Sequence, residues 1–305
     1  MQYTTVRAAN SGRAMTTSAH VHYGTSRGLN LDDLEHTTQA EIDTYLNYAR
    51  NNHVPLYLQT SHTVWLENRP DMMKLHHRVL PNFRKEYPEA VFMMSIGQLH
   101  TYIFLDWEIC ITNEFKVMQT QGITKTQLME IVMAAQIYAG IRGLEAVYRA
   151  TWPFIRDFQD RPQPAKFPDG WDYNIAAFKA GLDESTLELT PSDRQKLNDW
   201  YMQNGGEIPK WVTFMTRHRP EFLKAYRLRW EGIFRGALPR QCMPFMMIYH
   251  NVVNGYRDGL REAALLGKAW GMSKDWLLLA VIACAYYYTG FEGMNMVEDA
   301  IGDIL

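Results

Sequence analysis

The sequence predicts an all-α protein made of two similar halves. Apolar residues recur at helical spacing in every strongly periodic segment, and no segment shows the alternation expected of a strand. Three blocks of residues also recur in the same order about 150 positions apart, which indicates tandem duplication of one helical unit. The paired blocks are residues 122–125 with 271–274, 138–143 with 288–293, and 68–74 with 218–224. We therefore expect two tandem helical repeats that face each other as a pseudo-dimer.

The composition provides a large core and little net charge. Of the 305 residues, 47% are hydrophobic and 13% are aromatic, with nine tryptophans and 17 tyrosines, which suits large pockets or interfaces. The formal charge of −2 at pH 7 gives no reason to expect nucleic acid or an anionic membrane as a partner.

Cysteine usage and hydropathy favour a cytoplasmic protein. Cys110, Cys242 and Cys284 are far apart and form no CxxC, so we expect no disulfide framework and a reducing compartment. The longest apolar run, residues 276–288, is shorter than a bilayer requires, so no membrane span is expected. The first 29 residues contain three arginines and no acid. We expect a flexible or partner-wrapping arm there, with an organelle transit peptide as the alternative.

Helix signals define a first unit at residues 31–151, after an irregular N-terminal arm at residues 1–30. A helix-like run begins at Asn30. Pro70 is placed for the first turn of a second helix, and Pro88 begins a third.

The following helices of this unit carry the repeated blocks. One helix is expected over residues 104–120, and Gly122 ends it. Thr124 and Gln127 then form a capping box for the next helix, which Gly140 closes before a further helix opens.

A proline-rich stretch at residues 152–172 is the best linker in the chain. It separates the first unit from a second unit at residues 173–305. Within the second unit, Thr190 begins a helix and Gly205 with Gly206 forms a turn.

The order of these elements carries a family resemblance. A helix is followed by Gly-Ile-Thr at residues 122–124, then by a helix that ends in Tyr-Ala-Gly at residues 138–140, and then by an alanine-bearing third helix. This pattern resembles the carboxymuconolactone decarboxylase and AhpD-like superfamily over about fifty residues of the first copy, and more weakly in the second. The resemblance implies two AhpD-like repeats.

The resemblance also implies where the chemistry lies, namely on the helix before the glycine. The second cysteine position of the family looks like Cys110, its first cysteine position is Trp107, and its histidine position falls near Glu114. A disulfide cycle needs two neighbouring sulfurs, so this copy cannot run one. In the second copy the same positions hold Tyr256, Gly259 and Ala263, so we expect a single working site.

Four residues are candidates for proton transfer or other chemistry. Cys110 and Glu114 are four apart and share one helix face, so Glu114 can act as acid or base beside a pocket lined by Cys110. The plainer interpretation is a buried inert cysteine beside a surface glutamate. Glu108 is a further candidate, but its neighbour Asp106 is expected on a different helix face. His100 is a candidate proton shuttle that is matched by His250 in the second copy.

Further residues are candidates for binding the substrate. The alternative interpretation of His250 and His100 is a pair of core histidines that the two copies inherited. Arg257, like Arg261, can hold a carboxylate, although the interleaved acids Asp258 and Glu262 also indicate surface ion pairs. Aromatic candidates for the pocket wall are Trp107, Tyr138, Tyr256 and Tyr288.

The sequence shows no metal or cofactor motif. His62, His76 and His77 lack a partner at chelating spacing, and the standard nucleotide, hydrolase and zinc-protease motifs do not occur. Together with this absence, the family resemblance implies a cofactor-independent lyase of the decarboxylase type, acting on a small organic acid in aromatic or related catabolism. The alternatives are an AhpD-like thiol redox protein that uses Cys110 and a non-catalytic assembly protein. We expect a homo-oligomer, either a dimer or a small ring.

Overall fold

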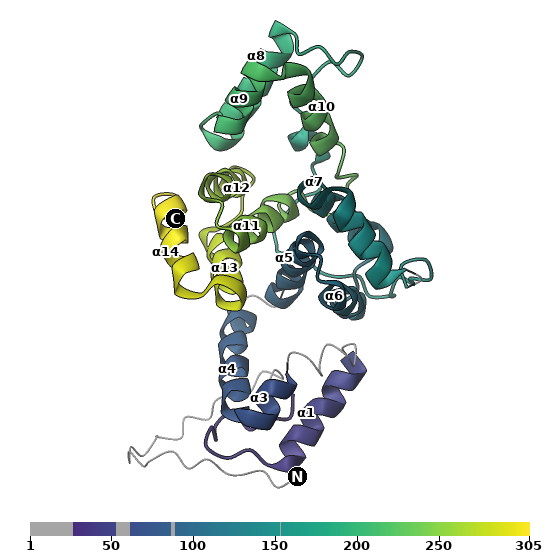
Figure 1. Cartoon of the computed structure of the whole chain (residues 1–305), viewed down its shortest axis with the longest axis vertical. Coiled ribbons are helices and arrows are strands. Elements are labelled where there is room, and N and C mark those ends of the chain that lie inside the picture. The colour runs from purple at the N-terminus through teal and green to yellow at the C-terminus, as the bar shows by residue number, and fades with distance from the viewer. Residues whose placement is uncertain (1–26, 53–61, 87–88, 153) are drawn as a thin grey trace. The chain divides into compact units, whose positions relative to one another are not determined.

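A computed structural model describes residues 27–52, 62–86, 89–152 and 154–305. These residues form helices and connecting loops, with no strand among them, which confirms the all-α class for the described chain. The chain divides into two compact units whose bounds differ from those of the predicted units (Figure 1). From here on, the first unit is Met1–Val91 and the second unit is Phe92–Leu305. Most of the predicted N-terminal arm, residues 1–26, lies outside the described residues, as does Pro88.

The first unit contains α1 (Gln39–Asn52), α3 (Thr63–Asn68) and α4 (Pro70–Glu86), with α3 packed on α4. Its core joins residues from the helices to residues from the segment that precedes them. The core members are Leu29, Leu31, Ile42, Tyr45, Leu66 and Met73. The helix expected from Asn30 begins only at Gln39, so that expectation is wrong. Residues 27–30 of the expected arm contain no helix, and Leu29 is buried in this core.

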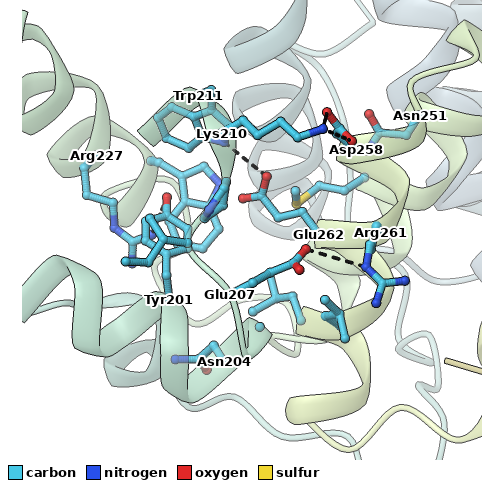
Figure 2. Close-up of a pocket in the computed structure, with 18 of the residues that line it drawn as sticks. Tyr201, Asn204, Glu207, Lys210, Trp211, Arg227, Asn251, Asp258, Arg261 and Glu262 are labelled. Atoms are coloured by element: carbon cyan, nitrogen blue, oxygen red, sulfur yellow. Dashed lines mark hydrogen bonds and ion pairs between the residues drawn. The ribbon is translucent and has the colours of Figure 1, made fainter. Parts of the chain in front are cut away.

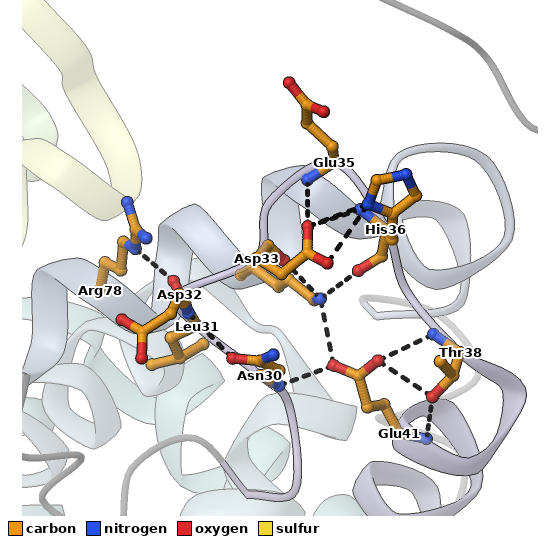
Figure 3. A network of polar contacts seen from close by, with 10 residues as sticks. Asn30, Leu31, Asp32, Asp33, Glu35, His36, Thr38, Glu41 and Arg78 are labelled. Atoms are coloured by element: carbon orange, nitrogen blue, oxygen red, sulfur yellow. Dashed lines mark hydrogen bonds and ion pairs between the residues drawn. The ribbon is translucent and has the colours of Figure 1, made fainter. Parts of the chain in front are cut away.

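A buried lysine explains why the chain before α1 forms a loop rather than a helix. The Lys74 ammonium on α4 lies 3.0 Å from a Glu41 carboxylate oxygen and donates to the carbonyl oxygens of Asp33 (2.7 Å) and His36 (2.6 Å). Arg78 Nε donates to a third loop carbonyl, that of Leu31 (2.7 Å; Figure 3). Carbonyls used in this way are not available to a helix, and their contacts satisfy a charge that would be costly to bury alone.

The second unit begins within α5 (Ala90–Leu105) and continues with α6 (Glu108–Thr120) and α7 (Lys125–Thr151). The single helix expected over residues 104–120 is wrong, because the chain breaks between α5 and α6. Asp106 has a φ of 58°, and the Trp107 N–H returns to the carbonyl of Tyr102 (3.0 Å). A residue with positive φ cannot continue a right-handed helix.

The turn between α6 and α7 matches the sequence prediction. Gly122 has a φ of 89° after the end of α6, and Thr124 and Gln127 form a complete capping box at the start of α7. Gly140 (φ 63°, ψ −152°) interrupts α7 and divides it into the two helices that were expected.

The predicted linker at residues 152–172 is an ordered part of the second unit where it is described. The Ala165 N–H donates to the Gly122 carbonyl (2.8 Å), Asp160 accepts from the Lys125 N–H (2.7 Å), and Phe158 is buried. The two compact units therefore meet between Val91 and Phe92 rather than at this stretch.

After the 3₁₀ turn η1 (Ile175–Phe178) come α8 (Pro191–Gly205), α9 (Lys210–His218) and α10 (Pro220–Glu231). Thr190 caps α8 as predicted, and Gly206 ends it in the left-handed conformation. A second buried lysine, Lys224 on α10, contacts Asp193 (2.7 Å) and the Glu188 carbonyl (2.8 Å).

The remaining helices are α11 (Cys242–Asn254), α12 (Arg257–Ala269), α13 (Lys274–Cys284), the π-helical turn η2 (Ala285–Thr289) and α14 (Gly290–Ile301). Residues 242–252 of α11 are all buried, and α11 packs against α12, α13 and α14. Gly97 of α5 permits close packing against α11, because a Cβ there would overlap the Tyr249 ring.

Several turns have matching backbone geometry in the two halves. Gly271 (φ 86°) matches Gly122, and Gly290 (φ 60°, ψ −148°) matches Gly140. The match extends to the caps of α6 and α12, to those of α7 and α13, and to the breaks before α4 and α10. The residues concerned are Trp107 with Tyr256, Thr124 with Ser273, and Arg69 with Arg219.

One helical stretch among the described residues, Lys274–Ile301, is long and apolar enough to cross a membrane by length and composition alone. Within the fold, 44% of its most apolar window is buried, and core helices of soluble proteins also meet this criterion.

Two equivalent glycines offer a matched test of the fold. Both Gly122→Ala and Gly271→Ala place a side chain at positive φ, which costs about 1–2 kcal/mol. A Cβ at Gly122 would also overlap the Gln163 carbonyl oxygen, whereas the space around Gly271 is open. Denaturant unfolding should therefore show at least about twice the loss of stability for Gly122→Ala. Equal losses would show that the 152–172 segment does not pack on this turn.

Candidate functional site

A cavity of about 610 Å³ lies within the second unit, between α8–α10 and α12, with α7 and α11 also contributing to its wall. Its volume is in the range of small-molecule sites. Six aromatic side chains line it, and two of them, Tyr201 and Trp211, are labelled in Figure 2. These side chains are Tyr138, Trp200, Tyr201, Trp211, Tyr226 and Trp230.

Glu262 is a carboxyl group in the lining of the cavity, next to the aromatic residue Trp211. It stands on α12, is half-buried, and accepts a hydrogen bond at Oε2 from the indole Nε1 of Trp211 (3.1 Å). Burial raises the pKa of Glu262 above its usual value, and the charge of Glu207 acts in the same direction. The indole hydrogen bond and the charge of Arg227 oppose this shift. A carboxyl group with a raised pKa suits proton transfer near neutral pH.

Three polar contacts join the segment after α8 to α12 across the cavity. Besides the Trp211–Glu262 hydrogen bond, Lys210 Nζ lies 2.9 Å from Asp258, and Arg261 Nε lies 3.6 Å from Glu207 (Figure 2). Arg261 is held more firmly by Asp303 through both terminal nitrogens (2.7 and 3.0 Å).

Arg227 on α10 is a buried cation at the cavity wall. Its Nε donates to Glu231 (2.8 Å), and a terminal nitrogen donates to the Phe178 carbonyl (2.7 Å). The guanidinium carbon lies 3.7 Å from the ring centroid of Trp200 and 4.6 Å from that of Trp230. The aromatic wall therefore already stabilises one cation by cation–π contact.

The structure brings four of the predicted site residues together, namely Tyr138, His250, His100 and, at the edge of the group, Tyr256. The Tyr138 and His250 rings are 4.3 Å apart, and the His100 ring is 5.5 Å from Tyr138 and 5.8 Å from His250. Both histidines are buried. Burial lowers the pKa of His250 to about 4 and that of His100 well below its usual value, so both are neutral at pH 7. Of these residues only Tyr138 lines the cavity. The two histidines contact the Tyr138 ring but are not part of the cavity lining.

Glu114 and Cys110 are buried on α6 and do not line this cavity. Burial raises the pKa of Glu114 to about 7, against the opposing effect of hydrogen bonds from Ser95 and Asn113. Burial, together with the charge of Glu114, raises the pKa of Cys110 to about 12. The Cys110 thiol is therefore protonated, and a protonated thiol is a poor nucleophile.

The predicted acids near the start of α6 form a surface ion-pair cluster. Arg149 contacts Glu108 (2.6 Å) and Asp106 (2.8 Å). The expectation that these acids lie on different faces of one helix is wrong, because the helix breaks between them. Trp107 is 47% exposed, and its ring lies 5.4 Å from that of Tyr102.

The remaining predicted binding residues also lie outside the cavity. Arg257 pairs with Asp299 of α14 (2.7 Å), while the exposed Tyr256 has its ring 5.9 Å from His250. The Tyr288 ring lies 6.1 Å from that of Tyr102.

Sequence reasoning missed most of the cavity. It favoured ion pairs along one helix for Glu262 and Arg261, whereas Arg261 pairs with Asp303, just after α14, and Glu262 lines the cavity. A signal was present, because five of the six aromatic wall residues fall between Trp200 and Trp230. Among the described residues, no group of three histidine, cysteine or acidic side chains is placed to hold a metal. His62 and His77 instead contact the Tyr45 hydroxyl (2.8 and 3.3 Å).

The raised pKa of Glu114 predicts a pH-dependent contribution to stability. The folded state binds this proton more tightly than the unfolded state, so the contribution is full below about pH 4.5 and lost as pH rises through about 7. The difference in unfolding free energy between wild type and Glu114→Gln should fall by on the order of 3 kcal/mol across that window. Denaturant unfolding at several pH values measures it, with the exposed Glu221→Gln as control. A pH-independent difference would contradict the burial of Glu114.

Comparisons with protein-family models, with curated proteins and with solved structures give no match for this chain. The resemblance to the carboxymuconolactone decarboxylase and AhpD-like superfamily stays a prediction.

Proposed function

We propose that this protein is a cofactor-independent enzyme that binds a small organic molecule in the cavity of the second unit and exchanges a proton with it through Glu262. The observation that carries the proposal is the position of Glu262, a half-buried carboxyl group on an aromatic wall with a raised pKa. In its ionised form such a group can take a proton from substrate carbon, leaving a carbanion or enolate, and the carboxylic acid that results can return the proton.

The cavity provides the other requirements of acid–base catalysis. The Trp211 indole holds one oxygen of Glu262, which fixes the orientation of the carboxyl group. The aromatic wall lowers the local polarity and strengthens interactions with charge that develops on the substrate. Proton abstraction from carbon followed by loss of a substituent is a lyase reaction, the class that the family resemblance implies.

A second candidate site is the buried Glu114 on α6. Its pKa, raised to about 7 by burial, suits proton transfer. The cavity site is favoured because Glu262 lines an open volume and Glu114 does not.

We also infer that the two halves are copies of one AhpD-like module packed as a pseudo-dimer. The matched turns support this inference, since paired glycines and caps recur with the same dihedral angles. The homo-oligomeric state and the cytoplasmic location remain predictions from the sequence.

Exchange of substrate protons in D₂O tests the role of Glu262. Wild-type protein should exchange carbon-bound protons of at least one member of a panel of keto acids, lactones and amino compounds, measured by proton NMR. Glu262→Gln should reduce that exchange by at least about 100-fold, because the amide cannot transfer the proton.

Two further variants make this result specific. Glu221→Gln is the same chemical change at an exposed position outside the cavity and should keep wild-type exchange. Glu114→Gln separates the two candidate sites. If Glu114→Gln abolishes exchange and Glu262→Gln does not, the reaction belongs to Glu114 on α6. Absence of exchange across the whole panel in wild-type protein would contradict the proposal.

Thiol labelling tests the redox alternative. Cys110, Cys242 and Cys284 are all buried, and burial raises the pKa of each. We expect a disulfide reagent such as dithionitrobenzoate to label none of them rapidly in the native protein and all three after unfolding. Rapid native labelling that is lost in Cys110→Ser would support the thiol redox function instead.

A further inference from the structure

The cations around the cavity have their charge matched by carboxylates of the protein itself. Lys210 lies 2.9 Å from Asp258, Arg227 lies 2.8 Å from Glu231, and Arg261 lies 2.7 Å from Asp303. Asp258 lines the cavity, whereas Glu231 and Asp303 stand outside its lining. A ligand carboxylate would have to compete with one of these close pairs, or with Glu207 for the Nε of Arg261.

Two carboxyl groups of the cavity are not matched in this way. Glu262 forms no ion pair within the described residues, and its hydrogen bond comes from the neutral Trp211 indole. Glu207 has Arg261 at 3.6 Å, but Asp303 already balances that arginine at closer range. The cavity therefore carries surplus negative charge at the end where α12 faces the segment after α8 (Figure 2).

The aromatic wall is suited to a positive charge. Trp200 and Trp230 contact the Arg227 guanidinium, which shows that the ring faces on this wall stabilise a cation. Trp211 and Tyr226 line the same cavity and are 40% and 46% exposed. Ring faces combined with a carboxylate are the usual means of binding organic ammonium groups.

We propose that the ligand of this cavity carries an ammonium group, which lies against the aromatic wall beside Glu262 and Glu207. This inference deepens the proposed function and rests on it, since it names the substrate class of the same site. It replaces the simple organic acid expected from the sequence with an amine-bearing molecule.

The protonation of Glu262 gives the inference a pH signature. Burial raises the pKa of Glu262, and a bound ammonium would favour the charged carboxylate, so binding releases a proton. Affinity should therefore rise with pH until Glu262 is fully ionised in the free protein. The groups that interact electrostatically with Glu262 are Glu207, Arg227, Tyr138 and Tyr201. The protein used to measure the pH dependence should therefore carry no substitution at these four residues.

The test compares three probes of nearly the same shape. Choline carries a quaternary ammonium, 3,3-dimethylbutan-1-ol is its neutral carbon analogue, and 3,3-dimethylbutanoate carries a carboxylate. Calorimetry or saturation-transfer NMR on the full chain should show choline binding at least about 10-fold tighter than the alcohol, and the carboxylate binding weakest. Equal or tighter binding of the alcohol or the carboxylate would overturn the inference.

Variants locate the effect and separate it from catalysis. Glu262→Gln should reduce the preference for choline over the alcohol to within about twofold, while Glu221→Gln should keep it. Retention of the preference in Glu262→Gln would overturn the assignment of the ammonium site. Choline binding without proton exchange on any substrate would leave this inference standing and defeat the proposed function. Proton exchange on acids that lack an amine, without choline binding, would support the proposed function and overturn the ammonium inference.

Discussion

Helix α11 must bury its polar residues along with its apolar ones, and this constraint shapes the second unit. Residues 242–252 are all buried, so His250, Tyr249 and Asn251 have to find space among neighbouring helices. Gly97 lets α5 approach the Tyr249 ring, and Tyr138 of α7 covers His250. Asn251 and Met247 reach the cavity wall. One buried helix thus places both the histidine cluster and one side of the cavity.

The sequence allowed the local structure to be predicted well where a residue type has one strong preference. Gly122, Gly140, the Thr124 capping box and Thr190 all act as expected, because positive φ and helix capping depend on nearby atoms. The break at Asp106 and the loop before α1 could not be predicted in this way. The loop depends on Lys74, which lies more than thirty residues away in the sequence, and periodicity does not report such contacts.

The candidate site was harder to predict because it is assembled from distant segments. His100, His250 and Tyr138 were identified as candidates through the repeat, and they do lie together. Glu262 was read as a surface residue, since charged residues at helical spacing normally pair along the helix. Its position depends on Trp211, about fifty residues earlier, and on Asp299 of α14 and Asp303 just after it, which pair with the arginines of α12.

Direct observation of the Glu262 carboxyl group is the sharpest test of this account. Carboxyl carbon NMR, with the signal assigned through Glu262→Gln, reports its pKa with and without choline. We predict a pKa above the usual value of 4.5 in the free protein and a lower pKa in the complex, because the bound cation favours the carboxylate. An ordinary pKa that does not respond to choline would contradict both the proton-transfer role of Glu262 and the ammonium site beside it.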